Sequence, residues 1–190
     1  KAGSAAEVYD VFEHLHEGLF ANIYLRWLYF SFGLLGAAMV ATGMILWVKK
    51  RQTNVKSQRK TSVISIIERI NIGVLVGVPI AIACYFWANR LLPISIINRP
   101  DWEVHCFFIA MLVSIAFAMC RSIKKSWSNL LWFTAFIYLL IPLLNAVTTQ
   151  HSILLSLQRS DWLMLGFDLS MLFFGACFAL AAITVKEIKA

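Results

Sequence analysis

The chain has 190 residues, of which 60% are hydrophobic and only 14% charged, and its mean hydropathy is +0.74. This composition excludes a soluble globular domain, and no polar stretch is long enough to bury a core of its own. The net charge of +7 could suggest nucleic acid, but the basic residues gather in short gaps between apolar runs. We therefore expect the lipid bilayer as a partner, and no nucleic acid.

The first 22 residues precede any long apolar run and are expected to form an amphipathic segment outside the membrane. This stretch does not resemble a signal peptide, because four acidic residues precede the first long apolar run: Glu7, Asp10, Glu13 and Glu17. Because the chain opens with Lys1 rather than methionine, we expect further chain upstream of it.

One helical face of this segment carries Asp10, Glu13, His14 and Glu17 at the i, i+3, i+4, i+7 spacing. Carboxylates and imidazole there could hold a divalent iron or zinc ion, or they could form a solvated acidic helix end. His16 lies off that face among apolar residues, so it could turn toward the membrane.

Five apolar runs are long enough to be transmembrane helices, because ~20 residues rising ~1.5 Å each cross the hydrocarbon core. The sequence predicts an all-α fold, a polytopic membrane helix bundle in which residues 23–190 form a single transmembrane domain. Within the second run, Gly73 and Gly77 stand four apart, a spacing that predicts an interface with a neighbouring helix. The runs are 27–48, 70–92, 103–120, 128–146 and 163–185.

The basic residues predict the orientation of these spans. Twelve of the 17 lysines and arginines fall on one side, mostly in the gap 49–60, the gap after residue 120 and the tail. The positive-inside rule places that side in the cytoplasm, with the N-terminus outside and the C-terminus inside. An even number of spans would follow from one helix upstream, which we expect to be missing here or to be replaced by a partner subunit.

All four histidines fall on the outer side: His14, His16, His105 and His151. Neutral imidazole is the usual axial ligand of a b-type haem, and two histidines from different elements can hold one iron. His105 is the best candidate, because a histidine one turn inside a span is costly without a partner. The alternative is an interfacial histidine bonded to a backbone carbonyl or to Glu103, and His14 or His151 could replace a chosen ligand.

Asp168 is the one acid well inside a span, where a carboxylate needs a partner or a wet cavity. Asn145, a histidine or an outer arginine could be that partner, and a simple hydrogen bond between helices would also explain it. The outer arginines could bind a haem propionate or a lipid phosphate. They are Arg26, Arg90, Arg99 and Arg159.

Several strings occur along the chain in a fixed order: LHEGLF (15–20), RWLY (26–29), TGMILW (42–47), ANRLLP (88–93), RPDWE (99–103) and LIPLLN (140–145). Together with Asp168, they resemble the PepSY-associated transmembrane protein family. Members of that family are bacterial inner-membrane proteins, often iron-regulated, that usually begin with a further membrane helix and a periplasmic segment. Some resemble haem-bearing reductases that pass electrons to ferric iron in siderophores.

The resemblance implies that His16, in the family's "LHxG" position, is a haem ligand, and it supports His105 less directly. The expected function is haem-dependent electron transfer that reduces ferric iron or a ferric siderophore at the periplasmic face, with haem b as cofactor. Arg26, Arg90 and Asp168 would surround this haem or bind its propionates. No histidine lies on the inner side, so an inner haem would need ligands from an upstream helix or a partner.

Two other functions stay open on the sequence. A non-redox iron or siderophore transporter, or a transport accessory, could use Asn71, Asn145 and Asp168 to line a polar path. A membrane anchor for a partner complex could use the glycine faces instead.

Overall fold

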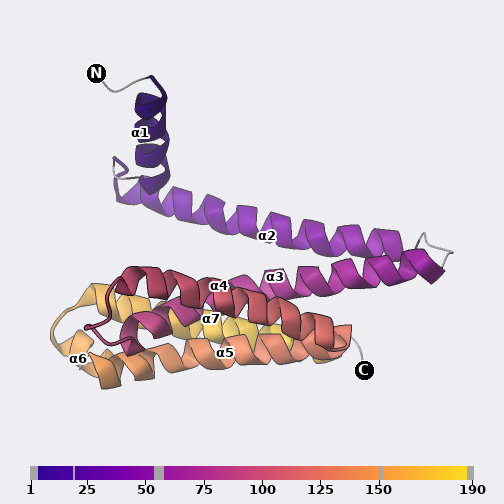
Figure 1. The fold of residues 1–190 in the computed structure, drawn as a ribbon. Coiled ribbons are helices and arrows are strands. Elements are labelled where there is room, and N and C mark those ends of the chain that lie inside the picture. The colour runs from indigo at the N-terminus through magenta and orange to yellow at the C-terminus, as the bar shows by residue number, and fades with distance from the viewer. Residues whose placement is uncertain (1–3, 19, 54–57, 150–151, 188–190) are drawn as a thin grey trace. The chain divides into compact units, whose positions relative to one another are not determined.

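The computed structural model describes residues 4–18, 20–53, 58–149 and 152–187. Within these ranges seven helices follow one another and no strand occurs (Figure 1). Five of the helices are long and apolar enough to cross a membrane: α2 (Ile23–Thr53), α3 (Gln58–Leu91), α4 (Arg99–Cys120), α5 (Ile123–Thr148) and α7 (Trp162–Glu187). The predicted all-α fold with five candidate spans is confirmed, and the orientation of the spans stays a prediction.

The helices extend beyond the apolar runs from which they were predicted. α2 continues to Thr53 and α3 begins at Gln58, so most of the basic gap between the first two spans is helical. Lysine, arginine and glutamine are good helix formers, and a helix can continue past the apolar part of its sequence. α1 (Ser4–Glu17) and the short α6 (Ile153–Gln158) complete the set.

Contacts along the chain divide it into two compact units, residues 1–47 and residues 48–190. The first unit holds α1 and most of α2, and the second holds the other helices. The division falls within α2, at a different place from the segment boundary after residue 22 that the sequence predicts, and that boundary stays a prediction.

In the first unit, a sharp corner joins α1 to α2. Gly18 has φ +62°, a left-handed conformation that glycine adopts without a steric penalty, and its N–H donates to the His14 carbonyl at the end of α1. Asn22 caps α2, because its Oδ1 accepts the Leu25 N–H at 3.0 Å. Arg26 Nε–H donates back to the Ala21 carbonyl at 2.9 Å, which closes the corner.

In the second unit, α3 packs against α4 and α5, α5 packs against α7, and α6 packs against α7. The core between them is aliphatic and aromatic, with Ile72, Ile80, Tyr138 and Ile141 among its most buried members. Trp87 Nε1–H of α3 donates to the Ile137 carbonyl of α5, and the Tyr138 hydroxyl donates back to the Pro79 carbonyl, each at 3.2 Å. These side chains fix α5 against α3.

Glycines set the distance between α3 and α4. A Cβ atom on Gly73 would stand 2.6 Å from Ile115 Cα, and one on Gly77 would stand 3.0 Å from Ser114 Cβ. Only a residue without a side chain permits such an approach, so the predicted helix interface at Gly73 and Gly77 is confirmed. Its neighbour is α4 of the same chain.

Candidate functional site

Polar side chains from four helices meet at one end of the second unit, where α3 and α5 end and α4 and α7 begin. They form two hydrogen-bonded groups, one through Asn89 and the other through Arg90, which are neighbours in α3. The members are Asn89, Arg90, Arg99, Glu103, Asn145 and Asp168. All of them except Asp168 lie in strings on which the family resemblance was based, and Asp168 was named together with those strings.

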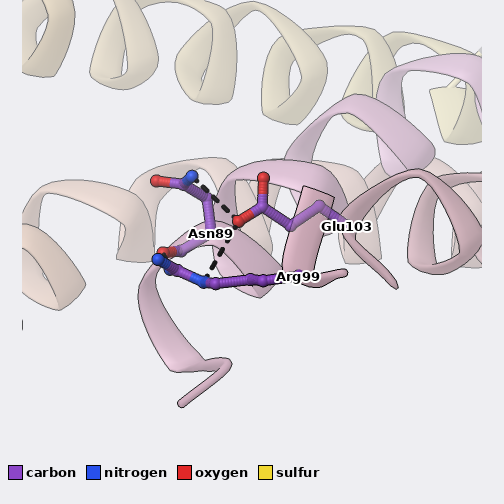
Figure 2. A network of polar contacts seen from close by, with 3 residues as sticks. All are labelled: Asn89, Arg99 and Glu103. Atoms are coloured by element: carbon purple, nitrogen blue, oxygen red, sulfur yellow. Dashed lines mark hydrogen bonds and ion pairs between the residues drawn. The ribbon is translucent and has the colours of Figure 1, made fainter. Parts of the chain in front are cut away.

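The first group ties the end of α3 to the first turns of α4 (Figure 2). Asn89 Nδ2–H donates to Glu103 Oε1 at 3.1 Å, and Arg99 Nε lies 3.3 Å from the same oxygen as an ion pair. Arg99 also donates from Nη2 to the Asn89 carbonyl. Glu103 is only 5% exposed, so its carboxylate obtains from Asn89 and Arg99 the partners that a buried charge needs.

The turn before α4 is what brings Arg99 and Glu103 into place. Asn98 adopts φ 57°, a left-handed conformation that asparagine tolerates better than most residues, and its carbonyl accepts the Asp101 N–H at 3.0 Å. Pro100 then stands in the first turn of the helix, where its fixed φ suits a helix start and its missing N–H leaves no bond unmade. Arg99 and Glu103 are therefore one helical turn apart, at i and i+4.

The second group joins α3, α5 and α7 through one amide. Arg90 Nε–H donates to Asn145 Oδ1 at 2.9 Å, and Asn145 Nδ2–H donates to Asp168 Oδ1 at 2.8 Å. Asp168 is fully buried, and Asn145 is 1% exposed. Of the partners considered for Asp168, the structure therefore selects Asn145, and Arg90 reaches the carboxylate only through the Asn145 amide.

The second oxygen of the Asp168 carboxylate has no hydrogen-bond partner among the described residues. Within the part of the chain that the structure describes, Asp168 Oδ2 is buried and has no hydrogen-bond partner, and the same is true of Ser156 Oγ in α6. An unpaired buried acceptor is unfavourable, so the helix packing leaves half of the hydrogen-bonding capacity of the Asp168 carboxylate unsatisfied.

His105 lies on the exposed side of α4, and its Nδ1 contacts the Asp101 carbonyl. A carbonyl oxygen only accepts hydrogen bonds, so Nδ1 is the donor of this contact, and Nε2 is the ring nitrogen left for another partner. The Trp102 ring is tilted against the imidazole, with 5.7 Å between centroids. Of the alternatives given for His105, the backbone carbonyl, and not Glu103, is the partner observed.

His14 repeats this arrangement in the first unit. It is exposed on α1, and its Nδ1 donates to the Asp10 carbonyl at 2.7 Å, again four residues back. The side chain of His16 and the whole of His151 lie outside the described residues. His16 belongs to residues 1–47 and His105 to residues 48–190, so their pairing on one iron stays a prediction.

No group of three or more histidine, cysteine, aspartate or glutamate side chains among the described residues is arranged to hold a bare metal ion. The predicted acidic face of α1 also includes Glu17, whose side chain lies outside the described residues, so this face is tested only in part. A divalent ion on that face stays an alternative from the sequence.

Sequence reasoning gave Asn89 no role and considered Glu103 only as a partner for His105. Both are polar residues at the ends of predicted spans, and the i, i+4 spacing of Arg99 and Glu103 was a readable signal for an ion pair. The bond from Asn89 to Glu103 depends on how α3 and α4 pack, which residue spacing does not reveal.

Helices of this length and hydropathy define the chain as a multi-pass helical membrane protein. Its first 50 residues, 50 of 190, match the model of a family described as the PepSY-associated TM region. The match includes the corner built by Gly18, Asn22 and Arg26, so the resemblance inferred from the sequence is confirmed over this part of the chain. No curated protein and no solved structure matches the chain.

Proposed function

We propose that this protein carries electrons in the bacterial inner membrane, with haem b as cofactor, and reduces ferric iron or ferric siderophores at the periplasmic face. The observation that supports it most is the state of His105. Its imidazole is exposed in a candidate span, with Nδ1 bonded to the Asp101 carbonyl and Nε2 left for a ligand.

The position of His105 favours a second partner, one for its Nε2 atom. It lies six residues after Arg99, about 9 Å along α4 from the first residue of that helix. Ionisable side chains within membrane spans almost always face a bundle interior or a wet cavity, or pair with one another or with a backbone carbonyl, and the Asp101 carbonyl pairs only with Nδ1 of His105. An exposed imidazole at this depth therefore favours a site that is completed by something bound against α4.

The donor chemistry of the described residues fits an axial haem ligand. Histidines that ligate a metal usually donate their other ring N–H to a carbonyl or carboxylate, which fixes the tautomer and the direction of the lone pair. His105 and His14 both show this arrangement. A bound haem would supply a one-electron iron couple, whose potential depends on the axial ligands and on burial.

The remaining members of the proposed site are carried over from the sequence. His16 is the second ligand that the family resemblance implies, and Arg26 and Arg90 are the proposed partners of the propionates. Arg90 already donates from Nε to Asn145, which would hold the guanidinium in place. Asp168, through Asn145, would stabilise that orientation of Arg90 and not contact the porphyrin.

An optical spectrum tests the proposal. Protein purified from haem-replete cells is expected to show a Soret band and, after dithionite, an α-band. His105→Ala should diminish both bands, whereas Val104→Ala, the neighbouring exposed position of α4, should leave them unchanged. A colourless wild-type protein, or equal bands in both variants, would contradict a haem on His105.

The transport alternative draws less support from the structure. The polar path it needs would use Asn145 and Asp168, but these side chains are buried and bonded to each other, which suits helix packing. Movement of ferric siderophore into proteoliposomes without any electron donor would favour transport over electron transfer.

A further inference from the structure

An apolar groove of about 960 Å³ lies between α4 and α5, with α3 along its side. Its walls are aliphatic and aromatic, and they include Ile80, Trp87, Val113, Phe117, Phe133 and Ile137. The Ser114 hydroxyl at the wall already donates to the Ala110 carbonyl at 2.8 Å. The groove therefore suits an apolar occupant.

The length of the groove matches one leaflet of a bilayer. On α4 it runs from Cys106 to Phe117, and on α5 from Asn129 to Leu140, which is eleven residue steps on each helix. At the rise of an α-helix this is about 16 Å, roughly half of the ~30 Å hydrocarbon core. Because both helices are candidate spans, the groove is expected to be surrounded by lipid.

One end of the groove is positively charged. Arg121 directly follows α4, and its Cζ lies 5.7 Å from the centroid of the Phe117 ring, which lines the groove. Lys125 is exposed in the first turn of α5, and Asn129 stands one turn further on the same helix face, at the groove. Cationic and polar side chains therefore lie at this end of the apolar groove.

The other end offers no such cation from α4. There Arg99 forms its ion pair with Glu103, and Arg90 of the neighbouring α3 is bonded through Nε to Asn145, so both guanidinium groups already have partners within the chain. The charge distribution along α4 is therefore complementary to a molecule with an anionic head near Arg121 and an apolar chain that extends toward Cys106.

We propose that this groove binds one anionic phospholipid, with an acyl chain between α4 and α5 and the phosphate held by Arg121 and Lys125. The helices around the groove are already fixed: close contacts at Gly73 and Gly77 hold α4 against α3, and the bonds of Trp87 and Tyr138 hold α5 against α3. Little conformational entropy is therefore lost when a lipid binds. His105 does not line this groove, and the proposal does not depend on the proposed electron transfer.

Lipid retention by the purified full chain, measured by native mass spectrometry, tests the charge requirement. Dioleoyl phosphatidylglycerol should bind with one molecule retained, and more tightly than dioleoyl phosphatidylcholine. Each of Arg121→Gln and Lys125→Gln should weaken phosphatidylglycerol binding about fivefold, since each cation near the surface contributes on that scale. Lys49→Gln, at an exposed position of α2 that does not line the groove, should not.

The groove itself is tested by a matched pair on α4. Val113 and Leu112 are both 61% exposed, but only Val113 lines the groove. Val113→Trp should fill the slot and abolish retention of the lipid, while Leu112→Trp should keep it, with equal thermal stability showing that both variants fold. Equal retention of the two lipids by the wild type, or equal effects of the two tryptophans, would overturn the proposal. So would unchanged binding in Arg121→Gln and Lys125→Gln, which are surface changes that leave the packing intact.

Discussion

Asn145 of α5 donates its side-chain N–H to Asp168 of α7 at 2.8 Å, and neither residue is reached by solvent or lipid from outside the bundle. The other side of the same amide accepts from Arg90 of α3. A single neutral side chain therefore separates a guanidinium from a carboxylate and bonds to both, which joins three helices at one point.

Removing this amide should destabilise the protein severely. Asn145→Ala leaves the buried Asp168 carboxylate without its hydrogen-bond donor and Arg90 Nε without its acceptor, a loss of about 3 kcal/mol. Thermal unfolding in detergent measures it. Asn129→Ala makes the same change at an exposed position of α5 and should cost little. Equal melting temperatures for the two variants would show that the bridge is not stabilising.

The Glu103 carboxylate should be coupled energetically to Asn89. Glu103→Ala removes the acceptor of Asn89 and the ion-pair partner of Arg99, and we expect a loss of about 2 kcal/mol. Glu103→Gln keeps an acceptor oxygen for Asn89 and should lose less. A double-mutant cycle with Asn89→Ala should give a coupling of about 1 kcal/mol. Strict additivity would argue that the two side chains do not interact.

The glycine contact between α3 and α4 should tolerate no side chain. Gly73→Ala places a methyl group 2.6 Å from Ile115 Cα, and since backbone cannot move aside cheaply, we expect a loss of about 2 kcal/mol or more. Gly36→Ala in α2 is the matched control, because no described atom lies within 4 Å of its added Cβ. That variant should be neutral or more stable, since alanine favours helix. Unfolding monitored by tryptophan fluorescence compares the two.

The corner at Gly18 should depend on its left-handed backbone. Gly18→Ala adds a strain of about 1–2 kcal/mol at φ +62°, although space for the methyl group exists. We expect faster amide exchange in α1, with α2 unaffected. Gly166→Ala in α7, where φ is not positive and the Cβ site is open, should change nothing. Unaltered exchange in α1 after Gly18→Ala would show that the turn does not need this conformation.

Much of the fold was predictable because the strongest signals are sums over many residues. Some 20 apolar positions define each span, so single polar residues such as Asn71 do not hide it. The ends of the helices were not predictable, because polar helix formers near Thr53 and Gln58 extend α2 and α3 beyond their apolar parts. The six residues of α6 are too few to show a period.

The candidate site was likewise predictable only in part. The spacing of Gly73 and Gly77 predicted a helix contact without naming its partner, α4, and the depth of Asp168 predicted a partner without choosing among the candidates. The choice of Asn145, and the link onward to Arg90, joins residues 55 positions apart in the chain. Such pairings follow from how the helices pack, and residue spacing alone does not contain them.

The corner at Gly18 has a consequence for where the first histidines can lie. At this corner α1 turns away from the direction of α2 instead of prolonging it (Figure 1). If α2 crosses the bilayer, α1 is then an interfacial helix that follows the lipid headgroups. The backbone at His14 and His16 would stay close to one depth, held there by the torsion at Gly18 and by the hydrogen bonds of Asn22 and Arg26.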